Sequence, residues 1–210
     1  MSDPTDDRLQ SIVDQICRSA DDVPPLVKAF ARAYVQRIPD HYLLRSDRDQ
    51  LCAHVLGMVE FAANRRGHEV LLRVYNPTLA EDGYTAQGSV VDIVTTDAPF
   101  LIDSMTMSLT AGGYTVENLV HPVVGVVRDS DGTLTEIMPA RGAPARESVQ
   151  HYELNRRLSE TELADLEEST RRVLRDVQRT TDDFEPMQGA VYRMMKIARE
   201  GAARYSAAEI

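Results

Sequence analysis

The stretch SVVDIVTT (residues 89–96), followed directly by DAPFLIDSMTMSL (residues 97–109), decides the fold of this chain. Its first part is rich in β-branched residues, which predicts a buried strand. Asp97 and Pro99 then mark a turn, after which apolar residues recur at the spacing of one helix face. A strand that leads through an acid and a proline into a helix can form a ligand site. It can also be an ordinary turn between two elements that binds nothing.

Strand patterns and turn signals surround this unit. Pro122 lies inside one predicted strand and indicates an edge position or a bulge, and DSDG (residues 129–132) predicts a hairpin turn. Ser159 and Glu162 form a capping box that opens an acidic helix. The predicted strands are 69–77, 89–96, 114–129, 133–138 and 147–154, and the predicted helices of this region are 99–111 and 159–179.

The order of these elements, β, β, α, β, β, β, α, favours an antiparallel sheet with helices on one face. The strand–helix–strand unit over 89–128 is expected to form a right-handed crossover. We therefore predict an α/β fold with a ferredoxin-like antiparallel sheet.

Further helices are predicted before and after this part of the chain. Residues 1–67 carry three helical patterns, closed by Gly67, and another helix is predicted from Pro186 onward. We divide the chain into an N-terminal helical segment (1–67), an α/β domain (68–180) and a C-terminal helix (181–210). The last helix reaches SAAEI without a glycine or proline stop, from which we expect the chain to continue in a longer protein.

The composition is that of a globular protein, and we expect it in the cytoplasm. Hydrophobic residues make up 43% and charged residues 27% of the 210 positions, and the net charge of −10 argues against nucleic acid or an anionic membrane as a partner. No apolar run approaches the roughly 18 residues of a transmembrane helix. From the acidic start MSDPTDDRLQ we expect no secretory signal. Cys17 and Cys52 fall in helical patterns and are expected in the core.

Sequence motifs of catalysis are missing. The chain has no glycine-rich nucleotide loop, no nucleophile elbow, no zinc-protease helix and no C-x-x-C pair. His121 and His151 lie on two predicted strands and, with Asp97 or Asp103, could imitate a metal site, but their spacing does not match metal-ligand patterns. We predict no catalytic residue, no metal and no cofactor in this chain.

The remaining chemistry is binding chemistry at the start of the helix over 99–111. Pro99 suits the first helical position, where its missing N–H costs nothing, and Asp97 can accept a backbone N–H as a cap. The free amides of the first turn carry a partial positive charge that suits a carboxylate ligand. The alternative is that Asp97 caps the helix and nothing binds there.

The same helix is nearly uncharged on both sides, since Asp103 is its sole charged residue. A helix without a charged outer face is expected to pack on both sides. The outer partner would be a second subunit or another part of a longer chain. The predicted interface residues are Ser104, Met107, Ser108 and Ala111.

Several segments together resemble one protein family. They are RVYNPT, VVDIVTTDAPFLIDSMTMSL, VHPVVGVVRDSDGTL and ESVQHYEL, followed by the capped acidic helix. Over residues 69–179 they resemble the N-terminal region of the large multidomain bacterial NAD-dependent glutamate dehydrogenases. That region resembles an ACT domain, a ferredoxin-like module that commonly binds amino acids and relays regulation. The resemblance implies a non-catalytic regulatory fragment, while the conversion of glutamate to 2-oxoglutarate and ammonia with NAD belongs to a distant C-terminal part of the parent enzyme.

The resemblance also implies positions for an effector. Amino-acid-binding ACT domains tend to read D-x-P-G after the first strand, because glycine lets the backbone approach the ligand. In this chain Phe100 takes the place of that glycine, and a phenyl ring would crowd the pocket. The matching effector-binding positions are Asp97, Ala98, Pro99, Phe100 and Asp103, with His121 as a neighbour from the next strand.

Three hypotheses remain open. In the first, the chain is a regulatory domain that senses an amino-acid effector, which the Asp-x-Pro loop favours. In the second, it is a purely structural module for oligomerisation or interdomain contact, which Phe100 and the uncharged helix favour. In the third, it is a free-standing enzyme, which the missing catalytic motifs oppose.

Overall fold

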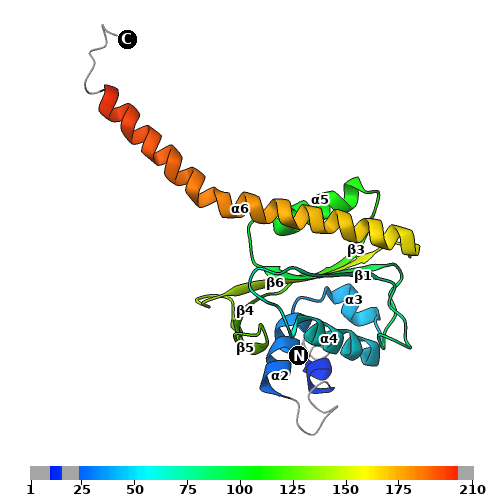
Figure 1. The fold of residues 1–210 in the computed structure, drawn as a ribbon. Helices are drawn as coiled ribbons and strands as arrows, with labels where there is room; N and C mark the ends of the chain where they lie inside the picture. Colours follow the sequence, from blue (N-terminus) through cyan, green and yellow to red (C-terminus); the bar gives the residue numbers. More distant parts are fainter. Residues whose placement is uncertain (1–9, 16–23, 203–210) are drawn as a thin grey trace.

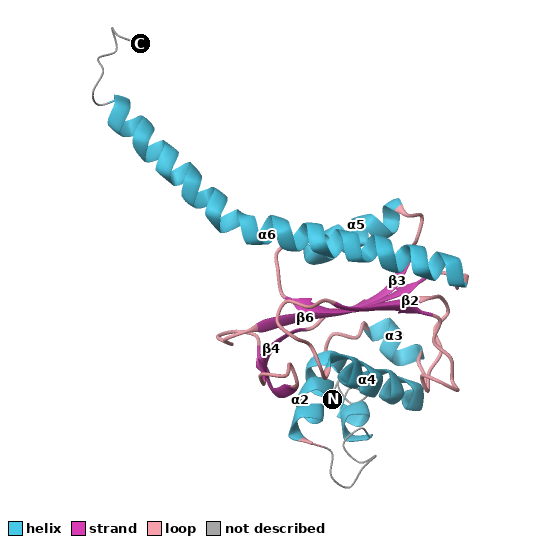
Figure 2. Cartoon of the chain, viewed as in Figure 1, coloured by secondary structure: helices cyan, strands magenta, loops and turns pink. Residues whose placement is uncertain are grey.

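A six-stranded antiparallel sheet lies between two layers of helices in the computed structural model, which describes residues 10–15 and 24–202 (Figures 1 and 2). Helices α5 and α6 cover one face of the sheet, and the N-terminal helices cover the other. The elements are α2 (Pro25–Val35), α3 (Asp40–Arg45), α4 (Arg48–Ala62), β1 (Leu71–Tyr75), β2 (Val90–Thr96), α5 (Leu101–Ala111), β3 (Val116–Val120), β4 (Val123–Arg128), β5 (Leu134–Pro139), β6 (Arg146–Leu154) and α6 (Glu160–Ala202).

The strand order is β1-β2-β6-β4-β5, and β3 also pairs with β6. β3 lies against the C-terminal half of β6 and β4 against its N-terminal half, so the two strands follow one edge of β6 in succession. The single strand predicted over 114–129 is therefore two strands, with Pro122 in the gap between them. This is the interruption that a proline without an N–H donor produces in a ladder.

The prediction of an α/β fold with an antiparallel sheet is confirmed. The strands β2, β6 and the β3–β4 edge form the ferredoxin-like centre together with α5, which follows β2 in the sequence, and α6, which follows β6. β1 occupies the outer position beside β2. The N-terminal helical segment lies on the face of the sheet opposite to α5 and α6, so both faces of the sheet are covered (Figure 2).

Coverage on both faces explains the apolar run of β2. Val94 belongs to the core between the sheet and the N-terminal helices, whereas Val91 and Ile93 belong to the core beneath α5 and α6. A strand with only one buried face would alternate apolar and polar residues. All residues of β2 from Val90 to Thr95 are buried, including Asp92.

The N-terminal segment contains one helix that the sequence pattern did not predict. The short α3 lies between α2 and α4 and ends at Ser46, whose hydroxyl donates to the Tyr42 carbonyl. Asp47 then caps α4 by accepting the backbone N–H groups of Asp49 and Gln50. Of the two cysteines, Cys52 is buried in α4 as expected, and Cys17 lies outside the described residues.

Helix α6 is continuous over 43 residues. The prediction of one helix over 159–179 and a separate one from Pro186 was therefore wrong, and α6 crosses the expected boundary at 180–181 without a break. A proline inside a helix removes one hydrogen bond and bends the axis rather than always ending it, and α6 changes direction in its orange part (Figure 1). Its first turn confirms the predicted capping box, because the Ser159 N–H and hydroxyl both donate to Glu162.

The two halves of α6 have different surroundings. The first half packs on α5 and β1 and buries Leu166, Leu174 and Val177. The second half projects away from the sheet (Figure 1) and exposes several apolar side chains, among them Met187, Met194 and Ile197. Within the described residues, no helix combines the length and the hydrophobicity that crossing a membrane requires.

Gly88 is the position where the fold depends most directly on a missing side chain. A Cβ atom at Gly88 would lie 1.8 Å from the Leu154 carbonyl oxygen at the end of β6. We expect Gly88→Ala to lower the free energy of unfolding by about 3 kcal/mol or more, because only backbone atoms could give way. Gly57→Ala is the matched control: its Cβ meets nothing within 4 Å in helix α4, so it should stabilise by about 0.5–1 kcal/mol. Urea unfolding of both variants measures the difference, and equal effects would contradict the close approach.

Candidate functional site

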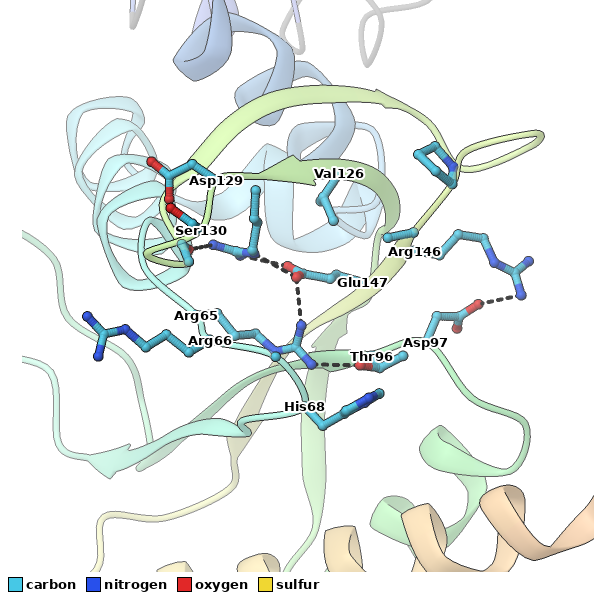
Figure 3. A pocket seen from close by; sticks show the side chains of 15 residues that line it. Arg65, Arg66, His68, Thr96, Asp97, Val126, Asp129, Ser130, Arg146 and Glu147 are labelled. Carbon is cyan, nitrogen blue, oxygen red and sulfur yellow. Dashed lines mark hydrogen bonds and ion pairs between the residues drawn. The ribbon is translucent and has the colours of Figure 1, made fainter.

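A cavity of about 630 Å³ opens beside the C-terminal end of β2 (Figure 3). Four segments far apart in the sequence line it: the loop after α4, the end of β2, the β4–β5 hairpin and the loop that leads into β6. Its polar lining residues are Arg65, Arg66, His68, Thr96, Asp97, Arg128, Asp129, Ser130, Arg146 and Glu147. We call it the arginine cavity.

The floor of the arginine cavity is a buried network around Glu147. Arg65 donates to Glu147 Oε1 at 2.7 Å, and Arg128 donates to both Glu147 oxygens at 2.8 Å. Arg65 also donates to the Thr96 hydroxyl and to the Glu69 carbonyl. One carboxylate thus joins two guanidinium groups, and the buried group carries a net positive charge that favours an anion nearby.

Arg128 ties the hairpin to the helical layer as well. Its guanidinium donates to the carbonyls of Ala62 and Gly132, both at 2.8 Å. The backbone of the turn is held from the same side, since the Arg65 N–H donates to the Gly132 carbonyl. The shape of the cavity therefore depends on the charged network beneath it.

The rim of the arginine cavity is open and carries charges of both signs. Arg146 and Asp97 form an ion pair at 3.4 Å, with the arginine side chain more than half exposed. Figure 3 shows these two side chains at one end of the cavity and Arg66 at the other. Exposed guanidinium groups suit a carboxylate, and Asp97 suits an ammonium group. A ligand that carries both groups, as an amino acid does, matches this rim.

The structure brings only part of the predicted effector positions to a cavity. Asp97 lines the arginine cavity, and with Ala98 and Pro99 it also lines a neighbouring cavity of about 200 Å³ between the loop and α6. Asp103 is exposed on α5 and lines neither of these two cavities. His121 likewise lines neither; it bonds the Ser148 hydroxyl at 2.8 Å, and burial lowers the pKa of its imidazole.

The prediction that Asp97 caps the helix was wrong. Helix α5 begins at Leu101, its N-cap residue is Phe100, and no side chain caps it. Asp97 is instead engaged with Arg146, both through its side chain and through its N–H, which donates to the Arg146 carbonyl. Three residues, Ala98, Pro99 and Phe100, therefore separate Asp97 from the first residue of α5.

Phe100 has the backbone conformation of a glycine position. Its φ is 65°, and it is the sole non-glycine residue with positive φ among the described residues. Such a conformation is strained for an aromatic residue. Its side chain is 63% exposed, so the ring points into solvent and does not crowd either cavity, contrary to the expectation from sequence.

The predicted interface helix exposes part of its outer side. Met107 is 71% exposed and Ala111 is exposed, whereas Ser104 and Ser108 are half-buried. Phe100 lies seven residues before Met107, close to the same side of the helix. This interface stays a prediction.

The two strand histidines do not face a common site. His151 bonds Asp92 at 2.6 Å inside the core, whereas His121 bonds Ser148. Among residues 10–15 and 24–202 there is no group of three His, Cys, Asp or Glu side chains arranged to hold a metal ion.

The residues that build the arginine cavity were missed by sequence reasoning. Arg65, Arg128 and Glu147 come from three distant segments, and no local pattern connects them. The one available signal was a charged residue within a strand, since Glu147 is the second residue of β6 and it and all the residues after it in the strand are buried.

Comparison with known proteins agrees with the resemblance noted above. A family model described as the glutamate dehydrogenase ACT1 domain matches residues 30–170. An NAD-specific glutamate dehydrogenase of Pseudomonas aeruginosa is 34% identical over 128 residues, which are 59% of this chain and 8% of that protein. One of Halomonas elongata is 30% identical over 185 residues, which are 87% of this chain and 11% of that protein. The chain thus spans a small part of the length of these relatives. No solved structure matches it significantly.

Replacing Glu147 tests the buried network. In Glu147→Gln the two guanidinium groups lose their shared carboxylate while the side chain keeps its size. We expect the free energy of unfolding to fall by about 3–5 kcal/mol, because removal of one partner leaves buried charge uncompensated. Glu136→Gln, on the exposed side of β5, is the control and should change stability by less than about 0.5 kcal/mol. Urea unfolding is the measurement, and equal midpoints for the two variants would argue against the network.

Proposed function

The chain belongs to the family of glutamate dehydrogenase ACT1 domains, and on this premise we propose that it is a non-catalytic regulatory domain that senses an amino-acid effector in the arginine cavity. The parent protein would be an NAD-dependent glutamate dehydrogenase that converts glutamate to 2-oxoglutarate and ammonia. NAD and the catalytic residues would belong to another part of that protein. We expect this chain alone to show no glutamate-dependent reduction of NAD, and we expect it in the cytoplasm.

The observation that carries the effector proposal is the Asp97–Arg146 pair at the rim of the cavity. The two side chains are 3.4 Å apart and solvent-accessible, so a ligand can replace each partner with its own charge. The α-carboxylate of an amino acid would bind Arg146, and the ammonium group would bind Asp97. The buried Arg65–Glu147–Arg128 network would hold the cavity in shape and add positive potential.

The Asp-x-Pro-x loop supports the same site. Phe100 has a left-handed backbone conformation, which glycine adopts readily, at the position that corresponds to the glycine of the D-x-P-G pattern. Its exposed ring leaves the space beside Asp97 open, so the aromatic substitution does not argue against a ligand.

A thermal-shift screen of the chain against the twenty amino acids, 2-oxoglutarate and NAD tests this function. A ligand at a hundredfold excess over its Kd stabilises by about 2.7 kcal/mol, which for this chain length corresponds to about 5–10 °C. We expect one amino acid to give such a shift. In Asp97→Asn the Kd of that amino acid should rise about tenfold or more, because a charge-assisted hydrogen bond is lost.

Asp103→Asn is the matched control, since it removes the other acid of the same segment, which is exposed and outside the cavity. It should leave the Kd unchanged. A screen without any shift, or an equal loss of binding in both variants, would refute an effector site at Asp97.

Assembly is a second candidate function, favoured by the exposed apolar side of α5. Phe100 and Met107 are both more than half exposed, and large apolar side chains close together on a surface often mark contacts between proteins. The predicted interface of Ser104, Met107, Ser108 and Ala111 would then pack against a second copy of the chain or against another domain of the parent protein.

Met107→Glu tests assembly. A buried carboxylate without a partner opposes association, so light scattering after gel filtration should show a smaller mass than for the unchanged chain, with the same unfolding midpoint. Thr106→Glu adds the same charge on a neighbouring exposed position and serves as the control. A mass that is the same for all three proteins would exclude self-association through this side of α5.

A further inference from the structure

A second polar cavity lies on the opposite face of the sheet from α5 and α6. It has a volume of about 100 Å³ and is formed by α3, α4, the loop before β2 and the C-terminal end of β6. Its lining residues include Tyr42, Asp47, Gln50, His54, Gln87 and Glu153. It shares no lining residue with the arginine cavity, and we call it the acidic cavity.

The acidic cavity contains a buried carboxylate without a cation. Glu153 is 4% exposed. Its oxygens accept the Gln87 N–H at 2.9 Å and the Asn118 side-chain amide at 2.8 Å, and it forms no ion pair with any other described residue. Neutral donors compensate a buried carboxylate only in part.

The other charged residue of the lining is also an acid. Asp47 caps α4 through one oxygen, and the lining includes no arginine or lysine. The cavity is therefore negative, and it lies beside a low-dielectric core in which charges are weakly screened.

His54 adds a nitrogen atom that has no partner. The residue is 1% exposed and lines the acidic cavity. Its Nε2 bonds the Tyr34 hydroxyl at 3.0 Å, and its Nδ1 is buried without any hydrogen bond. Tyr34 does not line the cavity, so the ring is fixed from the side of the core. Buried polar atoms normally have a partner, and this one calls for a ligand or a water molecule.

The protonation of His54 suits a ligand that donates hydrogen bonds. Burial and the neighbouring His151, whose ring centroid is 4.1 Å away, hold the pKa of His54 well below its usual value. The imidazole is therefore neutral near pH 7. When its proton lies on Nε2 and is donated to Tyr34, Nδ1 is an acceptor.

We propose that the acidic cavity binds an ammonium group, held by the Glu153 carboxylate and by Nδ1 of His54. The group is either the free ammonium ion or the head of a small primary amine, since both offer N–H donors and one positive charge. A volume of about 100 Å³ admits a few particles of water size, about 30 Å³ each. This inference concerns a different site from the proposed effector site and does not depend on it.

The chemistry of the lining separates ammonium from metal cations. Alkali and alkaline-earth ions prefer oxygen ligands and gain little from an imidazole nitrogen. Transition metals bind imidazole, but the described residues hold no group of three ligands for them. An N–H donor can use the carboxylate and the ring nitrogen together.

The test is a titration of the whole chain with ammonium chloride, potassium chloride and methylammonium chloride, near neutral pH and at an ionic strength held constant with sodium chloride. We expect ammonium to raise Tm in a saturable way, by about 5–10 °C at a hundredfold excess over Kd, and potassium to have no such effect. A response to methylammonium as well identifies an amine head as an occupant, whereas its absence identifies the free ion. Equal responses to potassium and ammonium would overturn the proposal.

Glu153→Gln identifies the site. It removes the charge and keeps the side chain's size, so the Kd for ammonium should rise at least tenfold. Glu136→Gln, exposed on β5, makes the same change elsewhere and should leave the Kd unchanged. Asp97→Asn should also leave it unchanged, which separates this site from the arginine cavity. Full retention of the ammonium response in Glu153→Gln would refute the site.

A second measurement on the unchanged chain covers the case in which Glu153→Gln does not fold. The ring nitrogen signals of His54 in a ¹⁵N NMR spectrum should shift with saturating ammonium, with the larger change at Nδ1. Unchanged His54 signals at a concentration that raises Tm would show that ammonium acts elsewhere.

Discussion

Three ionisable side chains on one face of β6 impose the main constraint on this structure. Glu147, His151 and Glu153 alternate with residues of the other face and point, with Val149, toward the N-terminal helices. Because β6 is the central strand and both faces of the sheet are covered, none of the three reaches bulk water. Each of these side chains therefore needs a charged or hydrogen-bonding partner inside the fold, and the partners of the three differ in kind.

The partners explain much of the surrounding architecture. Glu147 forms ion pairs with Arg65, at the end of the helical layer, and with Arg128 of β4. His151 bonds Asp92, its neighbour across the ladder on β2. Burial alone would raise the pKa of Asp92, but His151 and Arg73 hold it at about 2. Glu153 has only amide donors. The arginine cavity and the acidic cavity lie where Glu147 and Glu153, with their partners, approach the surface. The two cavities are at opposite ends of β6, about 20 Å apart at 3.3 Å per residue.

Sequence reasoning predicted the elements that follow from local pattern. The strands, helix α5 and the capping box at Ser159 were visible in the spacing of apolar residues and in turn chemistry. The motifs of the DAPFL segment led to the correct family.

Sequence reasoning failed where a contact between distant segments decides the structure. The Glu147 network joins residues 65, 128 and 147, and no local pattern pairs them. Asp97 looked like a helix cap because its contact with Arg146 is equally invisible in the local sequence. Pro186 was interpreted as the start of a separate helix, although enough helix formers on both sides allow α6 to continue through it.

The continuity of α6 has a mechanical consequence. Its first half is clamped between α5 and β1, while its second half stands free of the sheet. About twenty residues of helix extend roughly 30 Å at 1.5 Å per residue. Turning the clamped part by about ten degrees would swing the far end through about 5 Å. A rotation of this size in the first half would thus move the far end by about the pitch of one helical turn, at a place where α6 has no contacts with the core.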